Sequence, residues 1–241
     1  MKKNIKSVLN QLGYKISKLN KNNLLNENPF LAIKSRVANN PMIFDIGANQ
    51  GQTIEKIKSI FPESNLHSFE PSKRSFKILK EQFGQVKKIV LNNQAVGSEK
   101  GSLEFNEYSW SHISSFLRRA FTQSEIIDNY LVDIITVDAY CEENNIYNIN
   151  LLKTDTEGYE LNVLKGASKM LDENKIQFIF VEIFFYENYI GQSSFGDIYN
   201  YLSEKGFNMV RFYDVEYTNK GYASRTDALF VNENFKELKD V

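Results

Sequence analysis

The chain has 241 residues, 42% of them hydrophobic, which suffices for one α/β domain that buries roughly 70–75% of its unfolded surface. Its 29 basic and 30 acidic residues leave a formal net charge of -1, so no overall positive field favours DNA or RNA and we expect no nucleic-acid partner. The single Cys141 excludes an intramolecular disulfide, and no Cys/His cluster has zinc spacing, so we expect a cytoplasmic protein with no bound metal.

Residues 1–40 are predicted to form a helical appendage on a main domain of residues 41–241. Apolar residues of the first segment recur at helical intervals among lysines, unlike the continuous apolar core of a signal peptide. A basic amphipathic helix can lie on an anionic membrane surface, but more often it packs on its own domain or a partner subunit. We favour packing, and the sequence leaves open whether the chain forms a homo-oligomer. The lysines are Lys2, Lys3, Lys6, Lys15, Lys18 and Lys21.

From Pro41 onward, short β-rich runs alternate with segments of helical period. This alternation predicts an α/β fold with a mainly parallel sheet and helices on both faces. The apolar run at 178–186 contains Glu182 and is far shorter than the ~20 residues of a membrane helix, so it reads as a buried strand. The expected strands are Met42–Ile46, Leu66–Phe69, Lys88–Leu91, Asn150–Thr154, Phe178–Ile183, Phe207–Phe212 and Ala228–Val231. The expected helices bury Ile54, Ile57 and Phe61; Phe76, Leu79 and Phe83; Leu161, Leu164, Ala167 and Leu171; and Phe195, Ile198 and Leu202.

The alternation breaks between the third and fourth main strands. Here we expect a hairpin of 94–96 with 102–105, a polar loop around His112 and an extra strand at 133–137. Inserted loops commonly carry specificity while the sheet supplies the scaffold, so this segment is a candidate for acceptor recognition.

The stretch Asp45-Ile46-Gly47-Ala48-Asn49-Gln50-Gly51 follows the first strand and opens a helix. Glycine at such a turn lets the backbone reverse tightly and approach a ligand. The dinucleotide fingerprint G-x-G-x-x-G is absent, because Asn49 stands where its second glycine would be. A site for an amino-acid-bearing nucleoside is therefore favoured over a pyrophosphate site.

Glu70 ends the second strand, 23 residues after Gly47. An acidic residue at that place can accept hydrogen bonds from both ribose hydroxyls. Taken alone, the glycines could be turn residues and Glu70 a charge that favours a helix start, but their order and spacing together predict a cofactor site. We add Gln94, which opens the next short strand, to the cofactor-binding candidates.

A third group, Asp155 and Glu157, follows the fourth main strand. Both carboxylates should lie at the carboxyl edge of the sheet, where ligands bind in open α/β folds, near a cationic sulfonium and an incoming hydroxyl. The alternative is that Glu157 and Glu160 only complement a helix N-terminus.

These motifs resemble the FkbM-type methyltransferase family from about Pro41 to Asn232. The resemblance is carried by Asp45–Gly51, Phe69-Glu70-Pro71, Ile135–Asp138 and, most specifically, Leu152–Ala167. It implies a Rossmann-like sheet of seven strands, six parallel and one reversed, S-adenosylmethionine as cofactor, and O-methylation of a sugar, glycan or secondary metabolite. It also implies Asp45, Gly47, Asn49, Gly51 and Glu70 as cofactor positions, and Asp155 and Glu157 as acidic residues on the acceptor side. We count Asp155 among the cofactor-binding candidates as well.

An alcohol needs a base as the new bond forms, and the candidates are Asp155, Glu157, His112 and Glu182. His112 has a suitable unperturbed pKa, although a loop histidine is more often only solvated. Glu182 ends the fifth strand, and the alternative is that it only satisfies buried backbone donors there. Tyr186 and Tyr189 are candidates for a stacking platform or for core packing. His67 is expected to be structural.

Three rival functions share parts of this pattern. A methyltransferase acting on nucleic acid or protein would use the same cofactor site, but the chain lacks an Asn-Pro-Pro-Tyr-type motif and a basic excess. An NAD-dependent oxidoreductase would need a different glycine spacing. A non-catalytic nucleoside-binding protein is disfavoured because Asp45, Gly47, Glu70 and Asp155 are all present. A metal-assisted mechanism could use Asp155, but no second ligand pair is evident in the sequence.

Overall fold

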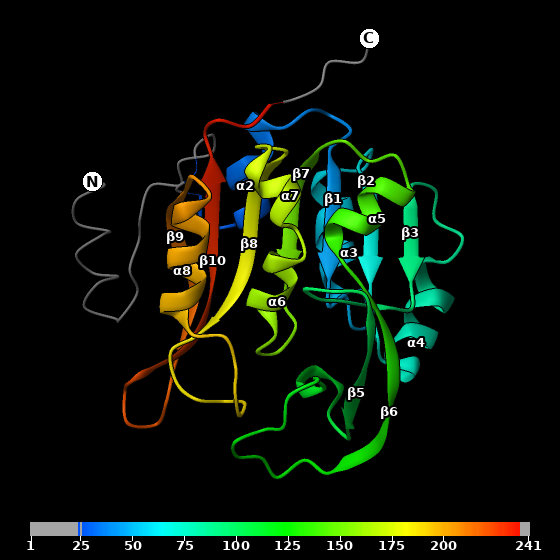
Figure 1. The fold of residues 1–241 in the computed structure, drawn as a ribbon, viewed down its shortest axis with the longest axis vertical. Helices are drawn as coiled ribbons and strands as arrows, with labels where there is room; N and C mark the ends of the chain where they lie inside the picture. The colour runs from blue at the N-terminus through cyan, green and yellow to red at the C-terminus, as the bar shows by residue number, and fades with distance from the viewer. Residues whose placement is uncertain (1–23, 25, 237–241) are drawn as a thin grey trace, which may run out of the picture.

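A computed structural model describes residue 24 and residues 26–236 of the chain. The strands of its main sheet are β1 (Met42–Ile46), β2 (Asn65–Phe69), β3 (Ile89–Asn92), β7 (Ile149–Thr154), β8 (Ile176–Phe184), β9 (Phe207–Tyr217) and β10 (Ala223–Asn232). Their order is β3-β2-β1-β7-β8-β10-β9 (Figure 1). β10 is antiparallel to both of its neighbours, β8 and β9, and every other neighbouring pair in this sheet is parallel. The predicted seven-stranded, mostly parallel sheet is therefore confirmed.

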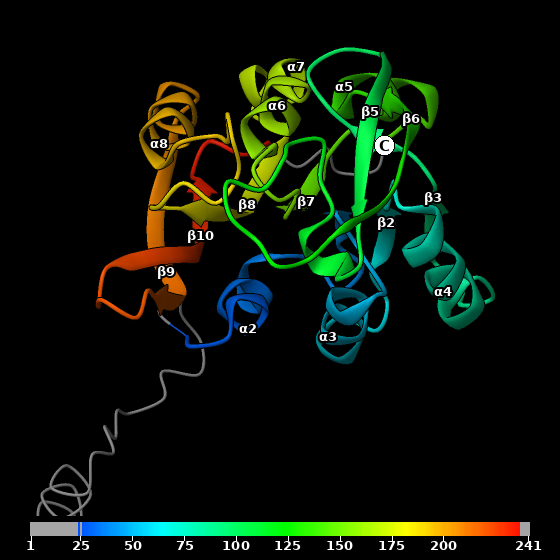
Figure 2. The same ribbon diagram turned by 90° about the horizontal axis from the view of Figure 1, so that it is seen from below.

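Helices cover both faces of this sheet, and Figure 2 shows the three layers end-on. One face carries α2 (Pro29–Ile33), α3 (Gln52–Ile60) and α4 (Lys73–Phe83), and the other carries α5 (Val137–Glu143), α6 (Glu160–Lys165), α7 (Ser168–Asp172) and α8 (Phe195–Glu204). Successive strand residues alternate between the faces: Ile43 packs with Ile54 and Ile57 of α3, and Phe44 packs on the side of α5 to α8. Each face therefore has its own hydrophobic core.

The lysine-rich first helix expected in residues 1–40 lies outside the described residues. The described part of that segment contains α2 and a short 3-10 turn, Lys34–Arg36. Phe30 and Ile33 of α2 are buried in the core beneath the sheet. The division of the chain at residue 40 stays a prediction. Among the described helices, none has the length and apolar character to cross a bilayer.

The third expected helix is in fact two short helices, α6 and α7, separated by Gly166 and Ala167. A Cβ on Gly166 would lie 2.0 Å from the backbone oxygen of Gly97, so two chain segments meet too closely here for a larger residue. The Asp138 carboxylate accepts the amide hydrogens of Lys169 and Met170 and so caps the second helix. The prediction of one continuous helix was wrong, because periodicity does not report a cap supplied from elsewhere in the chain.

A second, three-stranded sheet contains β4 (Ala95–Val96), β5 (Gly101–Tyr108) and β6 (Ile126–Ile135). Its order is β4-β6-β5, so the predicted hairpin of 94–96 with 102–105 is wrong. β5 pairs with β6 along its whole length, which offers far more ladder hydrogen bonds than two-residue β4 could. The extra strand ends at Ile135, because Thr136 accepts the Ala139 amide hydrogen and caps α5. β5 and β6 extend beyond the edge of the main sheet at which the parallel strands end (Figure 1).

Candidate active site

All the candidate residues lie on or near the carboxyl edge of the main sheet. The parallel strands β1, β2, β7 and β8 end there, and β10, which runs the other way, enters there. In the register of the sheet, Asp227 of β10 lies opposite Glu182 of β8, and Thr154 of β7 lies opposite Val181. Asp155, one residue beyond Thr154, is therefore brought beside Glu182.

A cavity that we call the glycine-turn cavity opens at the ends of β1 and β2. Gly47 adopts a φ of 80°, and the amide hydrogens of Gly47 and Ala48 both bond to the backbone oxygen of Phe69. A Cβ on Gly47 would stand 1.8 Å from the backbone oxygen of Asp155, so the turn packs directly on the end of β7. The lining of the glycine-turn cavity includes Gly47, Ala48, Asn49, Phe69, Glu70, Pro71, Gln94, Val96, Phe105, His112, Ser115, Phe116, Lys153, Asp155 and Glu157.

Glu70 is a buried carboxylate in this lining. Its Oε2 accepts the Asn49 amide hydrogen and its Oε1 accepts the Ser72 amide hydrogen, each at 2.7 Å. Burial raises the pKa of Glu70 to about 7, although the two backbone hydrogen bonds act to lower it. A carboxylate has roughly four acceptor positions, so two remain for a ligand hydroxyl pair. Asn49, with a φ of 47°, and Gln94 line the same cavity.

Asp45 and Gly51 lie outside this lining. Asp45 is fully buried and its Oδ1 lies 3.1 Å from Lys153 Nζ, which also lies 3.4 Å from Asp155 Oδ2. Burial disfavours the charged form of Lys153, but Asp155 and Asp45 outweigh it and raise its pKa. Gly51 has a φ of 99°, and a Cβ there would lie 2.2 Å from the ring of Phe83. Both residues therefore act on the cavity through neighbours, and no direct contact with a ligand follows from their position.

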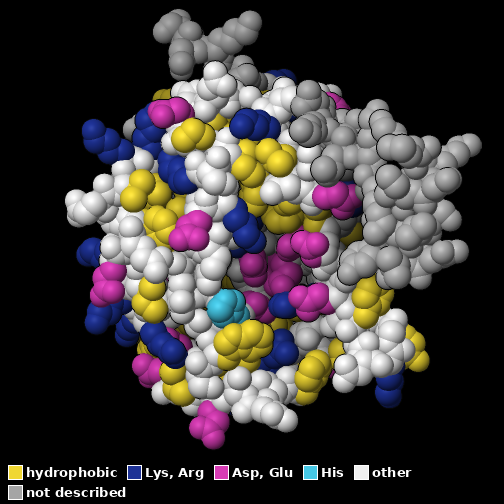
Figure 3. All heavy atoms as spheres, turned by 180° about the vertical axis from the view of Figure 1, so that it is seen from behind, with side chains coloured by type: hydrophobic (Ala, Val, Ile, Leu, Met, Phe, Trp, Pro, Cys, Tyr) yellow, Lys and Arg dark blue, Asp and Glu magenta, His cyan; other side chains and the backbone are white. Residues whose placement is uncertain are grey.

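A second cavity, the acidic cavity, lies beside the first. Figure 3 shows acidic side chains gathered in a hollow of the surface next to a histidine. One carboxylate oxygen from each of Asp155, Glu157 and Glu182 lies within 4.8 Å of the others. Burial, followed by the repulsion of neighbouring carboxylates, raises the pKa of Glu157 and of Glu182. The cavity is lined by Trp110, His112, Asp155, Glu157, Glu182, Asp214, Glu216, Arg225, Thr226 and Asp227.

Tyr189 holds Glu157 in place. Its hydroxyl donates to Glu157 Oε2 at 2.6 Å, and its ring is fully buried. Tyr189 therefore cannot form the stacking platform that the sequence suggested, because its ring is not accessible. Tyr186, in contrast, is 51% exposed and stays a candidate for that role. Glu157 has a φ of 54°, an uncommon backbone state for a residue with a side chain and one that often occurs at functional sites.

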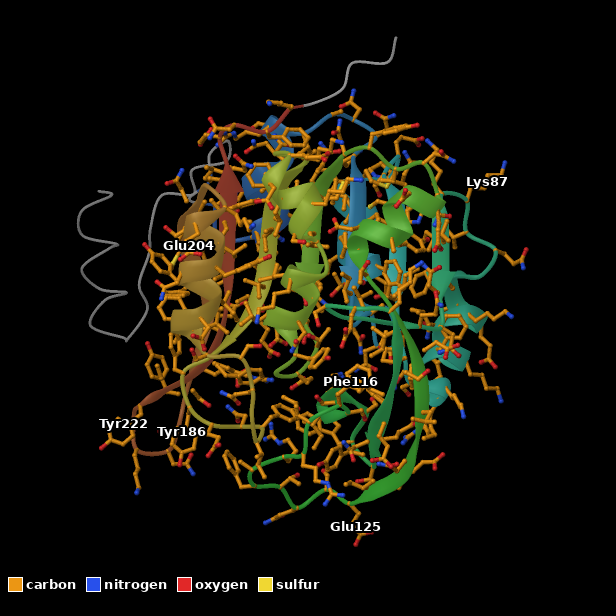
Figure 4. All side chains as sticks on the ribbon, viewed as in Figure 1. Lys87, Phe116, Glu125, Tyr186, Glu204 and Tyr222 are labelled. Atoms are coloured by element: carbon orange, nitrogen blue, oxygen red, sulfur yellow. The ribbon has the colours of Figure 1, made fainter. Side chains whose placement is uncertain are left out.

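The polar loop after β5 covers both cavities. Ser115 donates from its hydroxyl to the Glu157 backbone oxygen at 2.8 Å, which ties the loop to the turn after β7. Phe116, labelled in Figure 4, lies between the sheet edge and the β5–β6 pair and packs on Phe105 and Tyr159. His112 is exposed on this loop and, like Asp155 and Glu157, it lines both cavities.

Glu160 and His67 make contacts that stabilise the fold. Glu160 Oε1 accepts the amide hydrogens of Thr156 and Gly158, as expected of a carboxylate that caps a turn. His67 lies with its Nδ1 2.8 Å from the Tyr140 hydroxyl and its ring stacked on Phe44. These contacts agree with the structural interpretation of both residues.

Three residues that were not predicted from the sequence also lie at the site: Lys153, Arg225 and Asp227. Arg225 makes two 2.9 Å hydrogen bonds to Glu216 and lies 3.5 Å from Glu182. Burial raises the pKa of Asp227 to about 7. A signal was available: Lys153 is the one charged residue of a strand that is buried throughout, and the polar run from Arg225 to Asp227 precedes the apolar end of β10. That Arg225 and Asp227 lie beside Glu182 could not be predicted, because it depends on β10 running antiparallel to β8.

Comparison with known proteins adds three findings. The sequence profile of the methyltransferase FkbM domain matches residues 45–209. The 2-O-methyltransferase NoeI of Sinorhizobium fredii (strain NBRC 101917 / NGR234) is 27% identical over 164 residues, which are 63% of this chain and 67% of that protein. The crystal structure of Methyltransferase FkbM from Methylobacillus flagellatus KT has a TM-score of 0.51 and 15% identity over 81% of this chain. The chain spans only 44% of that crystallised protein, and the likeness to it is one of fold.

Proposed function

Because the chain belongs to the methyltransferase FkbM family, we propose that it transfers a methyl group to a hydroxyl oxygen of a sugar, a glycan or a secondary metabolite. S-adenosylmethionine is the methyl donor. The observation that carries the proposal is that His112, Asp155 and Glu157 line both the glycine-turn cavity and the acidic cavity. Donor and acceptor held in neighbouring cavities would meet at these three side chains.

The donor set of the glycine-turn cavity fits this cofactor. Glu70 offers two free acceptor positions for a pair of ribose hydroxyls. Phe69, Val96 and Phe116 supply apolar surface of the kind that an adenine ring needs. Asp155 brings negative charge toward the end of the cavity that meets the acidic one, where a cationic group is favoured. When bound, the cofactor supplies an electrophilic methyl carbon on a positively charged sulfur.

The chain's part in the reaction is to position the acceptor and to remove its proton. In-line displacement requires the acceptor oxygen to be held about 3–3.5 Å from the methyl carbon. A positioned base contributes about 10²–10⁴-fold to the rate, and Asp155, Glu157, Glu182 and His112 are the groups we propose for the acceptor side. Closing of the polar loop over both cavities would exclude water from this point.

The acidic cavity has features that suit a polyhydroxylated acceptor. Its carboxylates accept hydrogen bonds from hydroxyl groups. Trp110, at the rim, is 53% exposed and lies with its ring 5.6 Å from that of His112, so an aromatic face is free to contact a sugar ring. The 2-O-methyltransferase NoeI, at 27% identity, supports oxygen as the accepting atom.

The proposal is tested by incubating the full chain with methyl-labelled S-adenosylmethionine and separate pools of monosaccharides, oligosaccharides, transfer RNA and unrelated protein. We expect label in a saccharide pool and none in RNA or protein. Label in RNA or protein alone would contradict the proposed acceptor class. Binding of S-adenosylhomocysteine without transfer to any pool would instead favour the non-catalytic alternative.

A further inference from the structure

The acidic cavity is lined by more carboxyl groups than by cationic side chains. Lys153 contacts Asp155 at 3.4 Å but lies closer, at 3.1 Å, to the fully buried Asp45. Arg225 lies 3.5 Å from Glu182, but both of its shorter bonds go to Glu216. Each cation is thus shared with a carboxylate outside the cluster, so neither of them fully offsets the mutual repulsion of Asp155, Glu157 and Glu182.

The three clustered carboxylates also keep free oxygens. Asp155 gives Oδ2 to Lys153, and Glu157 gives Oε2 to the Tyr189 hydroxyl, which leaves the other oxygen of each for a ligand. Glu182 is only 6% exposed, and among the described residues its Oε2 has no hydrogen-bond partner. A buried carboxylate oxygen without a partner costs free energy unless a ligand satisfies it.

From this convergence of Asp155, Glu157 and Glu182 we infer a site for one hard divalent cation, of the Mg²⁺, Mn²⁺ or Ca²⁺ kind. Such ions take oxygen ligands, and carboxylates are their preferred protein ligands. Two oxygens on one Mg²⁺ lie at most about 4.2 Å apart and on one Ca²⁺ at most about 5.2 Å apart. The upper limit of 4.8 Å observed here falls between these values, so the three oxygens lie within reach of a Ca²⁺-sized ion and would draw together around the smaller Mg²⁺.

The inference deepens the proposed O-methylation, on which its catalytic role rests, but cation binding itself does not depend on that function. A cation beside an acceptor hydroxyl lowers the pKa of that hydroxyl. With the three carboxylates engaged as ligands, His112 is the remaining group common to both cavities and takes the hydroxyl proton as the oxygen–carbon bond forms and the carbon–sulfur bond breaks. From the sequence alone, Asp155 was a candidate for a metal-assisted mechanism without an evident second ligand pair, because Glu182 comes beside it only when β7 and β8 pair.

Titration of the full chain with Mn²⁺, followed by the loss of the free-ion electron paramagnetic resonance signal, tests the inference. We expect about one ion per chain and, in Glu182→Gln, affinity at least about tenfold weaker because one of three charged ligands is gone. Asp214→Asn is the matched control: Asp214 is an exposed acid in the same cavity, its φ of 48° suits asparagine, and affinity should stay within about threefold. Failure of Mn²⁺ to bind at millimolar concentration, or unchanged binding by Glu182→Gln, would overturn the inference.

Thermal melting separates a lost ligand from a damaged fold. In a chelator we expect Glu182→Gln to melt above the wild type, because one repelling carboxylate has been removed. With Mn²⁺ the wild type should melt higher and the variant should not change. A melting temperature of the wild type that is the same with and without Mn²⁺ would contradict the inference. Mn²⁺ binding together with no methylation of any saccharide would leave the cation site standing and would overturn only the proposed acceptor.

Discussion

Glu70 is the residue on which cofactor affinity should depend most. Its carboxylate lines the glycine-turn cavity and is held by two backbone amide hydrogens, so it is already positioned before a ligand binds. Glu70→Gln replaces one oxygen by a donor and should weaken binding of S-adenosylhomocysteine at least about tenfold, or about 1.4 kcal/mol. Isothermal titration calorimetry measures this. Glu81→Gln, on the exposed side of α4, is the control, and equal affinities for the two variants would remove Glu70 from the site.

The raised pKa of Glu70 predicts a pH dependence. Ribose hydroxyls donate to the ionised carboxylate, so affinity for S-adenosylhomocysteine should rise between about pH 6 and pH 8, through the pKa of about 7. Stability without ligand should change in the opposite direction. A carboxyl group whose pKa is raised by folding contributes stability below its unfolded value of 4.5 and loses it as the pH rises through about 7. Glu70→Gln should flatten both curves, and a pH profile of binding identical to that of the wild type would contradict the assignment.

Lys153 should matter to stability more than any exposed ion pair. It lies buried between Asp45 and Asp155, so Lys153→Met would leave Asp45 buried without its partner, at a cost of about 3–5 kcal/mol. Lys100→Met, which breaks the exposed pair with Glu143, should cost less than about 1 kcal/mol. Urea unfolding of both variants gives the comparison. Equal losses would mean that the buried pair is not a stabilising contact.

At the scale of elements, the turn between β1 and α3 packs against the end of β7, beside residues that line both cavities. Gly47→Ala places a methyl group 1.8 Å from the Asp155 backbone oxygen at a φ of 80°. We expect a loss of at least about 1–3 kcal/mol in stability, with displacement of the turn from the end of β7. Gly101→Ala is a matched control, because no atom lies within 4 Å of its added Cβ. Circular dichroism melts that coincide for the two variants would contradict the close packing of turn and strand.

The elements that the sequence predicted well are those with a local signal. Most of the main strands contain a short apolar run between turn residues, and α3 buries Ile54 and Ile57 as their spacing indicates. The errors occur where distant contacts decide. The expected β4–β5 hairpin does not form because β5 pairs with β6 instead. The long antiparallel ladder between them needs residues 126–135, which follow β5 only after a loop. The split of α6 from α7 depends on Gly97 and Asp138, which are far from Gly166 in sequence.

At the scale of the whole molecule, the site is a product of strand order. Glu70, Asp155 and Glu182 end neighbouring or nearby parallel strands, so their meeting at one edge was predictable from the alternation of strands and helices. The contribution of Arg225 and Asp227 to the site was not predictable, because it requires β10 to pair antiparallel with β8. The buried position of Tyr189 depends on packing between the loop after β8 and the loop after β5, for which no periodicity exists.

The joint action of the two cavities is tested most directly by a crystal structure of the full chain with S-adenosylhomocysteine. We expect the ribose hydroxyls to donate to Glu70 and the sulfur to point toward the side chains of His112, Asp155 and Glu157. A complex in which the ribose contacts neither oxygen of Glu70, or in which the sulfur faces away from the acidic cavity, would contradict this expectation.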